Sequence, residues 1–595
     1  MSGRCVWSPA AGRVEVVVGA KRRAMERADG GWWRTEAPIA PEEGYAFALD
    51  GGDPLPDPRS RWQPSGVHGP SRPFDPSRFP WTDADWSPPP LETGLIYELH
   101  VGTFTPEGTF DGVIGRLDHL VELGVTHVEL MPVAEFSGGR GWGYDGVDLF
   151  AAHHAYGGPD GLCRLVDACH ARGLAVLLDV VYNHLGPEGN YLPRFGPYFT
   201  DRHQTAWGSA LNLDGRDSDE VRRFLCDNAI FWLRDCHFDG LRIDAVHAIV
   251  DTSATHLLEE LASEVAALER RLSRRLVLIA ESDANDPRLV RGPAVGGFGL
   301  TASWNDDFHH AIHALLTGER SGYYADFGGL AELAKVLTDV FAYDGRYSAF
   351  RGRRHGRSAQ GLSGSRFVGF VQNHDQVGNR AEGDRLGRLV SSGRLEIAAA
   401  LLFTAPFVPL LFMGEEWAAS TPFLYFTDHG DPDLGRAVRD GRRREFAAFG
   451  WDPERIPDPQ ARESFERSKL DWTELERPRH RRILAWYRSL AALRRASPEL
   501  MNGRMDEVEV AIDERADWIR IERGRFTLVA NLSPRTATIP LRPGRPEAIL
   551  LASGEEPVLR EGALALQRDA VVIFGESTSR PGEPVAQPTP TRARS

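Results

Sequence analysis

The feature that most constrains the fold is an alternation of apolar, strand-length runs with amphipathic, helix-length segments that begins at Leu95. Parallel strands that are covered on both faces are almost continuously apolar, and each connection between them needs a crossover helix. Eight units of this kind close into a (β/α)8 TIM barrel. The sequence therefore predicts an α/β fold centred on such a barrel. The predicted strands are Leu95–Phe104, His127–Val133, Leu174–Val181, Gly240–Val246, Leu276–Glu281, Thr301–Asn305, Phe367–Gln372 and Val408–Phe412.

Shorter apolar runs separated by Gly and Pro flank the predicted barrel. The runs RVEVVVG and YAFALDG predict an immunoglobulin-like β-sandwich and linker in 1–90, and WIRIERGRFTLVANL and AVVIFG predict a second β-sandwich in 496–575. The catalytic barrel is assigned to 91–495, with a long loop insertion after its third strand at 182–216. The tail 576–595 is rich in Pro, Ser and Thr and is predicted to be disordered.

Composition excludes several classes of partner. The chain has 595 residues and a formal net charge of −15, and no basic stripe interrupts the acidic balance. A nucleic-acid or anionic-membrane partner is therefore not expected. The longest apolar run, 398–413, is broken by Thr404, Pro406 and Pro409. It predicts a buried helix that leads into a buried strand, and not a membrane span.

Cysteine usage and the N-terminal residues indicate a cytoplasmic protein. The five cysteines are odd in number and have no CxxC spacing, which favours reduced thiols over a disulfide framework or a zinc site. The first residues, MSGRCVWSPAAGRV, contain no apolar stretch of signal-peptide length.

Carboxylates follow four of the predicted barrel strands. Strand three contains Asp179, strand four ends at Asp244, strand five at Glu281 and strand seven leads to Asp375. Active sites of (β/α)8 barrels lie at the carboxyl ends of the strands. An aspartate at a strand end can also cap the following helix, but four carboxylates at one rim are difficult to explain by capping alone. Asp179 keeps the most structural character, because it can hold Arg242.

The segments DVVYNH, GLRIDAVH, IAES and QNHD resemble the four signature regions of the α-amylase superfamily. The resemblance implies that Asp244 is the nucleophile, that Glu281 is the general acid and then base, and that Asp375 binds sugar hydroxyls and favours the cationic transition state. It also implies a set of substrate-binding residues around the same sugar: Tyr144 in WGYDG, Asp179, His184, Arg242, His247 and His374.

Physical chemistry agrees with these roles. Hydrolysis with retention needs two carboxyl groups about 5 Å apart, one ionised and one protonated. Arg242 precedes Asp244 by two strand positions, so both side chains point the same way and the guanidinium is expected to lower the pKa of Asp244. No arginine is close in sequence to Glu281. We therefore expect Asp244 and Asp375 to raise the pKa of Glu281, as suits a general acid.

No metal or other cofactor is predicted. His309 and His313 are four residues apart in a probable helix, but the glutamate of an HExxH motif is missing, so a structural role is favoured. Asn183 matches a calcium ligand of many α-amylases, but the other ligands cannot be placed in this loop.

Finer motifs narrow the substrate. WGYDGVDLFAAHHAYGGPDG, IAESDANDPRLV, WNDDFHHAIHALLTGERSGYYADF and FVQNHDQVGNRAEGDRL together resemble the maltooligosyltrehalose trehalohydrolases. This implies a maltooligosaccharide-type substrate, release of trehalose by cleavage of the adjacent α-1,4 bond, and functional pairing with a maltooligosyltrehalose synthase. A glycogen branching enzyme, which transfers the glucan to a sugar 6-hydroxyl, is the alternative; a third hypothesis is a glucan-binding protein without activity.

The end of the sixth strand is expected to hold the leaving trehalose. Trp304, Asp306 and Asp307 lie there, and Glu415 and Glu416 follow strand eight. Buried polar groups that a plain glucan would leave unpaired can give large discrimination between substrates. The alternative is that Asp306 caps the next helix and that Trp304 is a core residue.

Overall fold

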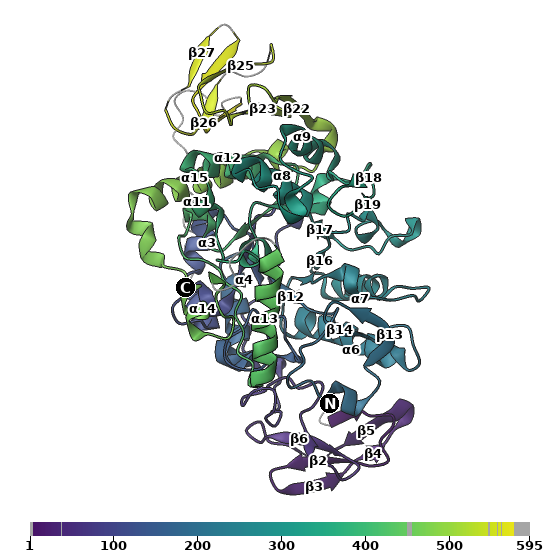
Figure 1. The fold of residues 1–595 in the computed structure, drawn as a ribbon. Coiled ribbons are helices and arrows are strands. Elements are labelled where there is room, and N and C mark those ends of the chain that lie inside the picture. Colours follow the sequence, from purple (N-terminus) through teal and green to yellow (C-terminus); the bar gives the residue numbers. More distant parts are fainter. Residues whose placement is uncertain are drawn as a thin grey trace.

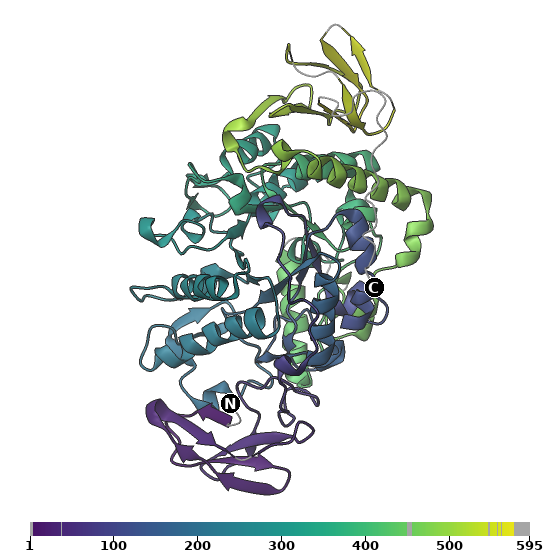
Figure 2. The same ribbon diagram turned by 180° about the vertical axis from the view of Figure 1, so that it is seen from behind.

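The computed structural model describes residues 4–36, 38–448, 455–544, 548–555, 557–560 and 562–575. The predicted disordered tail 576–595 lies outside these residues. The molecule is elongated, with the N-terminal strands at one end, the C-terminal strands at the other and the barrel between them (Figure 1). The view from behind shows the same order (Figure 2). Within the described ranges, no helix combines the length and the apolar character that crossing a bilayer requires.

The centre is a closed barrel of eight parallel strands, which confirms the predicted fold class. In barrel order the strands are β8 (Ile96–Leu99), β9 (His127–Leu130), β12 (Ala175–Val180), β15 (Gly240–Ile243), β16 (Val277–Ala280), β17 (Ala302–Trp304), β20 (Phe367–Phe370) and β21 (Val408–Phe412). Every predicted strand is present. The first one is shorter than predicted, because the chain turns into α1 (Val101–Phe104) after β8.

Helices connect the strands and cover the outside of the barrel. The principal ones are α3 (Leu117–Leu123), α4 (Gly158–His170), α6 (Ser218–Ile230), α7 (Leu257–Leu272), α8 (Asp306–Thr317), α9 (Leu330–Asp339), α12 (Ser392–Thr404) and α15 (Pro478–Arg495). Another helix, α13 (Pro432–Ala448), contributes side chains to the mouth of the barrel. The helix α12 is buried along most of its length and leads into β21. This confirms the interpretation of the apolar run 398–413 as a buried helix and strand.

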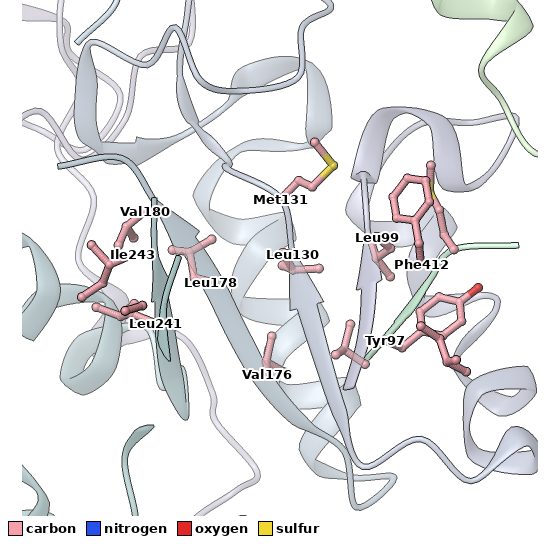
Figure 3. Packing of buried hydrophobic residues seen from close by; sticks show 14 of the residues in the cluster. Tyr97, Leu99, Leu130, Met131, Val176, Leu178, Val180, Leu241, Ile243 and Phe412 are labelled. Atoms are coloured by element: carbon pink, nitrogen blue, oxygen red, sulfur yellow. The ribbon is translucent and has the colours of Figure 1, made fainter. Parts of the chain in front are cut away.

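Alternation along the strands divides their side chains between two environments. Leu130, Leu178 and Leu241 belong to the large cluster that packs strands against helices, part of which is shown in Figure 3. The strand residues that alternate with this first set form a second apolar cluster. Its members include Ile96, Leu177, Ile279, Trp304 and Phe370. Because successive strand side chains point to opposite faces, the second cluster fills the barrel interior. Glu98, Glu129, Asp179 and Arg242 continue this interior set toward the carboxyl ends of the strands.

The insertion after the third barrel strand has its own secondary structure. It contains the short α5 (Leu192–Phe195) and a hairpin of β13 (Phe199–Thr205) and β14 (Gly208–Leu211). The sequence analysis described 182–216 only as a long loop. Ala206 and Trp207 form the turn of the hairpin. The insertion is therefore a folded segment with an exposed tryptophan, Trp207, at its tip.

Paired antiparallel sheets lie at both ends of the molecule. At the N-terminus, one sheet has β1 (Arg4–Trp7), β5 (Trp32–Thr35) and β4 (Glu26–Arg27), and the other has β3 (Lys21–Ala24), β2 (Val14–Val18), β6 (Tyr45–Leu49) and β7 (Pro54–Leu55). At the C-terminus, one sheet has β22 (Val508–Asp513), β23 (Trp518–Arg523), β24 (Phe526–Asn531), β29 (Ala570–Phe574) and β26 (Ile549–Ala552), and the other has β25 (Ala537–Pro540), β28 (Ala563–Leu566) and β27 (Val558–Arg560).

Candidate active site

The carboxylates expected at the strand ends meet at one mouth of the barrel. Asp244 follows β15, Glu281 follows β16, and Asp375 lies in α10 (His374–Gly378), which follows β20. All three line a cavity of about 890 Å³. Parallel strands in a barrel direct their carboxyl ends to the same face, so residues far apart in sequence converge there.

A buried arginine organises the floor of this cavity. Arg242 Nη1 donates to both carboxylate oxygens of Asp179 at 2.9 Å and to Asp244 Oδ1 at 2.8 Å. Its Nη2 lies 3.8 Å from Glu281 Oε2, and the Trp304 ring lies 4.2 Å from its Cζ. A guanidinium that contacts several carboxyl groups favours the ionised form of each. One cation therefore acts on both Asp244 and Glu281, although sequence adjacency indicated only Asp244.

The second oxygen of Asp244 is held by Asn183. Asn183 Nδ2 donates to Asp244 Oδ2 at 2.8 Å and to its backbone carbonyl at 2.9 Å. The amide oxygen of Asn183 accepts a hydrogen bond from His184 Nδ1. Both ends of the side chain are therefore engaged in the site, which gives Asn183 a role that does not require the calcium ion considered from the sequence.

Glu281 is partly buried, with a 14% exposed side chain, and one of its carboxyl oxygens is hydrogen-bonded to the backbone. The backbone N–H of Ala245 donates to Glu281 Oε2 at 2.6 Å, and Ala245 has φ of 39°, in the left-handed region that costs a residue with a Cβ about 1 kcal/mol or more. Burial raises the pKa of Glu281 well above its usual value; Arg242 opposes this shift and Asp244 adds to it. The expected direction is thus present, with burial as the main cause. The other carboxyl oxygen of Glu281, Oε1, is the one that can carry the proton when the group is neutral.

Tyr144 and His374 form a bonded pair beside Asp375. The Tyr144 hydroxyl donates to Asp179 Oδ2 at 2.7 Å and lies 2.6 Å from His374 Nε2, with the two rings stacked at 5.2 Å. Gly143 has φ of 104°, and a Cβ there would lie 2.2 Å from the Pro132 carbonyl, so the turn before Tyr144 requires glycine. Burial lowers the pKa of His374, but Asp375 and Glu98 outweigh it and raise the pKa to about 9.

The structure places the expected site residues in three groups. Tyr144, His184, His247 and Asp306 line the cavity with the three carboxylates. Asp179, Arg242 and His374 are buried directly behind that lining and hold it in place. Trp304 and Asp307 are buried and do not line the cavity.

Trp304 and Asp307 have structural partners that explain their burial. Trp304 is the last residue of β17, belongs to the apolar interior of the barrel and carries Arg242 on its ring. Asp307 Oδ2 accepts hydrogen bonds from the backbone N–H groups of Ala342 and Tyr343 at 2.7 and 3.0 Å. It also accepts one from Asn285 Nδ2 at 2.9 Å. The cap of α8 is Asn305, whose side chain accepts from Phe308 N, so the alternative that Asp306 caps this helix does not apply.

Glu415 and Glu416, expected on the rim, are buried below it. Glu416 accepts from the Tyr97 hydroxyl at 3.0 Å and lies 2.8 Å from His119 Nε2, while Glu415 accepts from the Tyr487 hydroxyl at 3.1 Å. Neither lines the cavity. Their carboxylates connect the segment after β21 to the strand β8 and to the helices α3 and α15, and they do not face the cavity.

Several cavity residues were missed by sequence reasoning. Trp207, at the tip of the β13–β14 hairpin, is 51% exposed and stacks on His184 at 4.7 Å with an 8° interplanar angle. Further residues on the wall are Trp142, Asp145, Asp283, His310, Tyr323, Phe350, Arg351, Tyr425 and Arg442. Exposed aromatic residues inside the long insertion were the available signal for Trp207, because sugar faces pack on aromatic rings.

The wall beyond Glu281 is rich in charge. Arg351 Nη2 donates to Asp283 Oδ2 at 2.9 Å. Burial, followed by the charges of Asp283 and Asp375, raises the pKa of Asp306 to about 7. An aspartic acid with this pKa is half protonated near neutral pH and can donate or accept a hydrogen bond.

The histidines weighed as metal ligands have other partners. His309 contacts the Val371 carbonyl and the Tyr324 hydroxyl, and His313 contacts Glu319. Of the described residues, two groups could enclose an ion, and neither lies at the cavity: Glu135, His153 and His154, and Cys226, Glu260 and Glu264. His153 Nδ1 accepts from Ala155 N–H, which places the proton of a neutral ring on Nε2 and disfavours ligation there.

Two family profiles match the chain. "Alpha amylase, catalytic domain" matches residues 75–205, and "Domain of unknown function (DUF3459)" matches residues 503–573.

Whole-chain comparisons are more specific. The malto-oligosyltrehalose trehalohydrolase of Arthrobacter ramosus is 52% identical over 570 residues, which is 95% of this chain and 97% of that one. A crystal structure titled as a putative alpha amylase from Salmonella typhimurium is 40% identical with a TM-score of 0.88, covering 96% of this chain and 97% of that one. By contrast, a 1,4-alpha-glucan branching enzyme of Vibrio parahaemolyticus is 33% identical over 49% of this chain and 43% of its own length.

Proposed function

Since this chain belongs to the malto-oligosyltrehalose trehalohydrolase family, we propose that it hydrolyses the α-1,4-glucosidic bond next to the terminal trehalose of a maltooligosyltrehalose. The products are trehalose and a shortened maltooligosaccharide. The observation that carries the chemistry is the arrangement in which Arg242 contacts Asp244 while Glu281, partly buried in the same cavity, has a raised pKa. The branching-enzyme alternative is supported only by a relative that covers half of the chain.

The proposed reaction is a double displacement. Asp244 attacks the anomeric carbon, and Glu281 donates the proton on Oε1 to the glycosidic oxygen, so the bond to trehalose breaks as the glycosyl ester forms. Trehalose then leaves. A water molecule attacks the anomeric carbon while Glu281 takes its proton, and the bond between that carbon and the Asp244 oxygen breaks. This step releases the maltooligosaccharide and restores the Asp244 carboxylate and the protonated Glu281. The configuration at the anomeric carbon is retained.

The remaining residues act on the sugar whose bond breaks. Asp375 accepts hydrogen bonds from ring hydroxyls and stabilises the positive charge of the transition state. Tyr144 provides the aromatic face under that sugar. His184, which stacks on Trp207 and donates from Nδ1 to Asn183, accepts a hydrogen bond from one of the sugar hydroxyls at Nε2. Arg242 holds Asp244 Oδ1 by a hydrogen bond of 2.8 Å and so orients the carboxylate for attack.

Trehalose is proposed to bind on the side of Glu281, because the acid must reach the oxygen of the leaving group. The residues on that side of the cavity are Asp283, Asp306, His310, Phe350 and Arg351. They replace Trp304 and Asp307 as the candidates for selectivity. Trehalose has no reducing end and a bent 1,1-linkage, so charged and aromatic groups can bond its hydroxyls and remain unpaired with maltose.

The test compares maltotriosyltrehalose with maltopentaose, which has the same number of glucose units. We expect a kcat/KM at least about 100-fold higher for the trehalose-capped substrate, with trehalose as the product. Equal values would leave a general amylase. New α-1,6 branches in the products would favour the branching enzyme. A β-configured reducing end on the fresh maltooligosaccharide, read by proton NMR before mutarotation, would refute the double displacement.

The cellular setting and the domain limits are proposals as well. All five cysteines are free, four of them buried, which fits the cytoplasmic location inferred from the sequence. An enzyme that creates the terminal 1,1-linkage, a maltooligosyltrehalose synthase, must supply the substrate. The proposed domains are 1–90, 91–495 and 496–575.

A further inference from the structure

A buried glutamate, Glu98, lies behind the proposed catalytic residues Asp244, Glu281 and Asp375. Glu98, in β8, is 1% exposed and points into the barrel interior below the cavity. Its Oε2 accepts the backbone N–H of His374 at 3.0 Å, and its Oε1 forms an ion pair with His374 Nδ1 at 2.5 Å. The same carboxylate thus holds both the backbone and the ring of the first residue of α10, and the next residue in that helix is Asp375.

We propose that Glu98 is a positioning residue, which fixes the first turn of α10 and keeps the His374 ring as a cation that orders Tyr144 and Asp375. The inference rests on the proposed function only for the roles of Tyr144 and Asp375. The charge state of His374 is a property of the protein without substrate.

Hydrogen-bond directions support a doubly protonated ring. The Tyr144 hydroxyl has one proton, and it donates that proton to Asp179 Oδ2 at 2.7 Å. Its contact of 2.6 Å with His374 Nε2 must therefore be donated by the ring. Since Nδ1 faces a carboxylate that can only accept, Nδ1 also carries a proton. Both ring nitrogens are donors, which only the imidazolium form allows.

The charges around His374 come from several elements. The titratable groups that face or influence it come from six other segments and from its own helix: Glu98 on β8, Glu129 on β9, His100 after β8, Tyr144 in the loop before β11 (Asp148–Ala152), Asp179 on β12, Arg242 on β15, and Asp375 next to it. Of these, Asp375 Oδ2 lies 3.4 Å from Nε2 and favours the charged ring. Arg242 opposes it. Glu98 is the carboxylate in direct contact with Nδ1, so its removal deletes both a hydrogen bond and a charge.

Glu129 provides a matched control. It pairs with Glu98 in the β8–β9 register and is also 1% exposed. Neither of its carboxyl oxygens has a hydrogen-bond partner among the described residues. Burial, and then the charge of Glu98, raises its pKa well above the usual value, which favours its neutral form. Replacing it by glutamine keeps the size of the side chain and breaks no hydrogen bond to the described residues.

The experiment compares Glu98→Gln with Glu129→Gln in the full-length protein. The ring pKa of His374 is measured by NMR with labelled histidine, using His374→Gln to assign the signal, and the pH profile of kcat is measured on maltotriosyltrehalose. We expect Glu98→Gln to lower the ring pKa by two units or more and to lower kcat at pH 8 by about tenfold or more. Glu129→Gln should leave the ring pKa unchanged and kcat within about threefold.

A double-mutant comparison separates positioning from general damage. If Glu98 acts through His374, Glu98→Gln should lower kcat much less in the His374→Gln background than in the wild type. Equal losses in both backgrounds would overturn the proposal. If Glu98→Gln does not fold, the titration of His374 in the wild type still tests the proposal. A His374 ring that is neutral at pH 7 would contradict it. Failure of the trehalose selectivity would leave the ring titration unaffected.

Discussion

Charge at single residues decides how the site can work. Arg242 contacts Asp179 and Asp244 and approaches Glu281, so two carboxylates share one cation while the acid is left more distant. Burial penalises every charged form, and it raises the pKa of Asp179 to about 6 although Arg242 bonds both of its oxygens. Asp244 and Glu281 differ in their contacts with the guanidinium, although both side chains are carboxyls.

We predict that Asp244→Asn and Glu281→Gln each lower kcat by several orders of magnitude with little loss of folding stability. Removing the nucleophile or the proton donor acts on the chemical step. Initial rates on maltotriosyltrehalose give the effect, and circular dichroism controls for folding. An Asp244→Asn protein that retained a tenth of the wild-type rate would exclude Asp244 as nucleophile.

Asp306 gives a prediction for the pH dependence of stability. Burial raises its pKa from 3.8 to about 7, so the folded state binds a proton that the unfolded state has lost above pH 4. The contribution of Asp306 to the free energy of unfolding therefore falls as the pH rises from 4 to 7. Asp306→Asn removes this dependence. We expect the variant to gain about 1–3 kcal/mol over the wild type between pH 4.5 and pH 8.

Thermal melts of wild type and Asp306→Asn at the two pH values measure the difference. The Asp375→Asn protein serves as the control for loss of a cavity carboxylate that is more exposed. A Tm difference that stayed constant between the two pH values would show that Asp306 does not titrate in this range.

At the level of elements, two neighbouring aspartates in the first turn of α8, Asp306 and Asp307, have different surroundings. Asp306 faces the cavity, whereas Asp307 turns inward and binds the loop that follows α9 through Ala342 and Tyr343. Consecutive helix positions point in directions about 100° apart. Adjacent acids therefore reach different surroundings, which depend on how the helix is rotated against the barrel.

We predict that Asp307→Ala destabilises the protein without changing its selectivity. The substitution leaves two buried backbone N–H groups without an acceptor and should lower the free energy of unfolding by about 2–4 kcal/mol. Denaturant unfolding measures this loss, and Asp307→Asn, which keeps an acceptor oxygen, should lose less. The ratio of kcat/KM for maltotriosyltrehalose and maltopentaose should match the wild type. If the variant were as stable as the wild type but less selective, Asp307 would instead contribute to trehalose binding.

At the scale of the whole molecule, buried arginines join the C-terminal sheet to the barrel. Arg523 in β23 donates to the carbonyls of Thr404, Ala405 and Asn502, and Arg494 in α15 donates to those of Phe403 and Phe407. These carbonyls lie mostly at the end of α12, where helical backbone bonding stops. The chain turn before β21 thus depends on side chains from distant segments.

We predict that Arg523→Ala lowers the free energy of unfolding by about 2–4 kcal/mol, because several buried carbonyls lose their donor. The cavity is lined by other residues, so kcat should stay within about twofold. Arg525→Ala is the matched control: Arg525 pairs with Glu499 at 3.3 Å, and both are about 30% exposed, so about 1 kcal/mol or less should be lost. Equal destabilisation by both changes would contradict the role given to Arg523.

The sequence by itself determined the barrel and the four segments that reach its mouth. Strand-length apolar runs and helical periodicity are local properties, so all eight strands were placed from them. Asp244 and Glu281 end their strands, and the closure of a parallel barrel brings such ends together wherever they lie in the chain.

Only the tertiary structure decided which side chains face the cavity. A shift of one strand position reverses the face of a residue, and one helix position rotates it by about 100°. Trp304 therefore supports Arg242 from the barrel interior, and Asp307 binds the backbone. Trp207 reaches the cavity because an inserted hairpin folds over it, and Glu98 contacts His374 across the barrel. The backbone contact of Asp307 spans 35 positions and that of Glu98 spans 276, so no local sequence pattern encodes them.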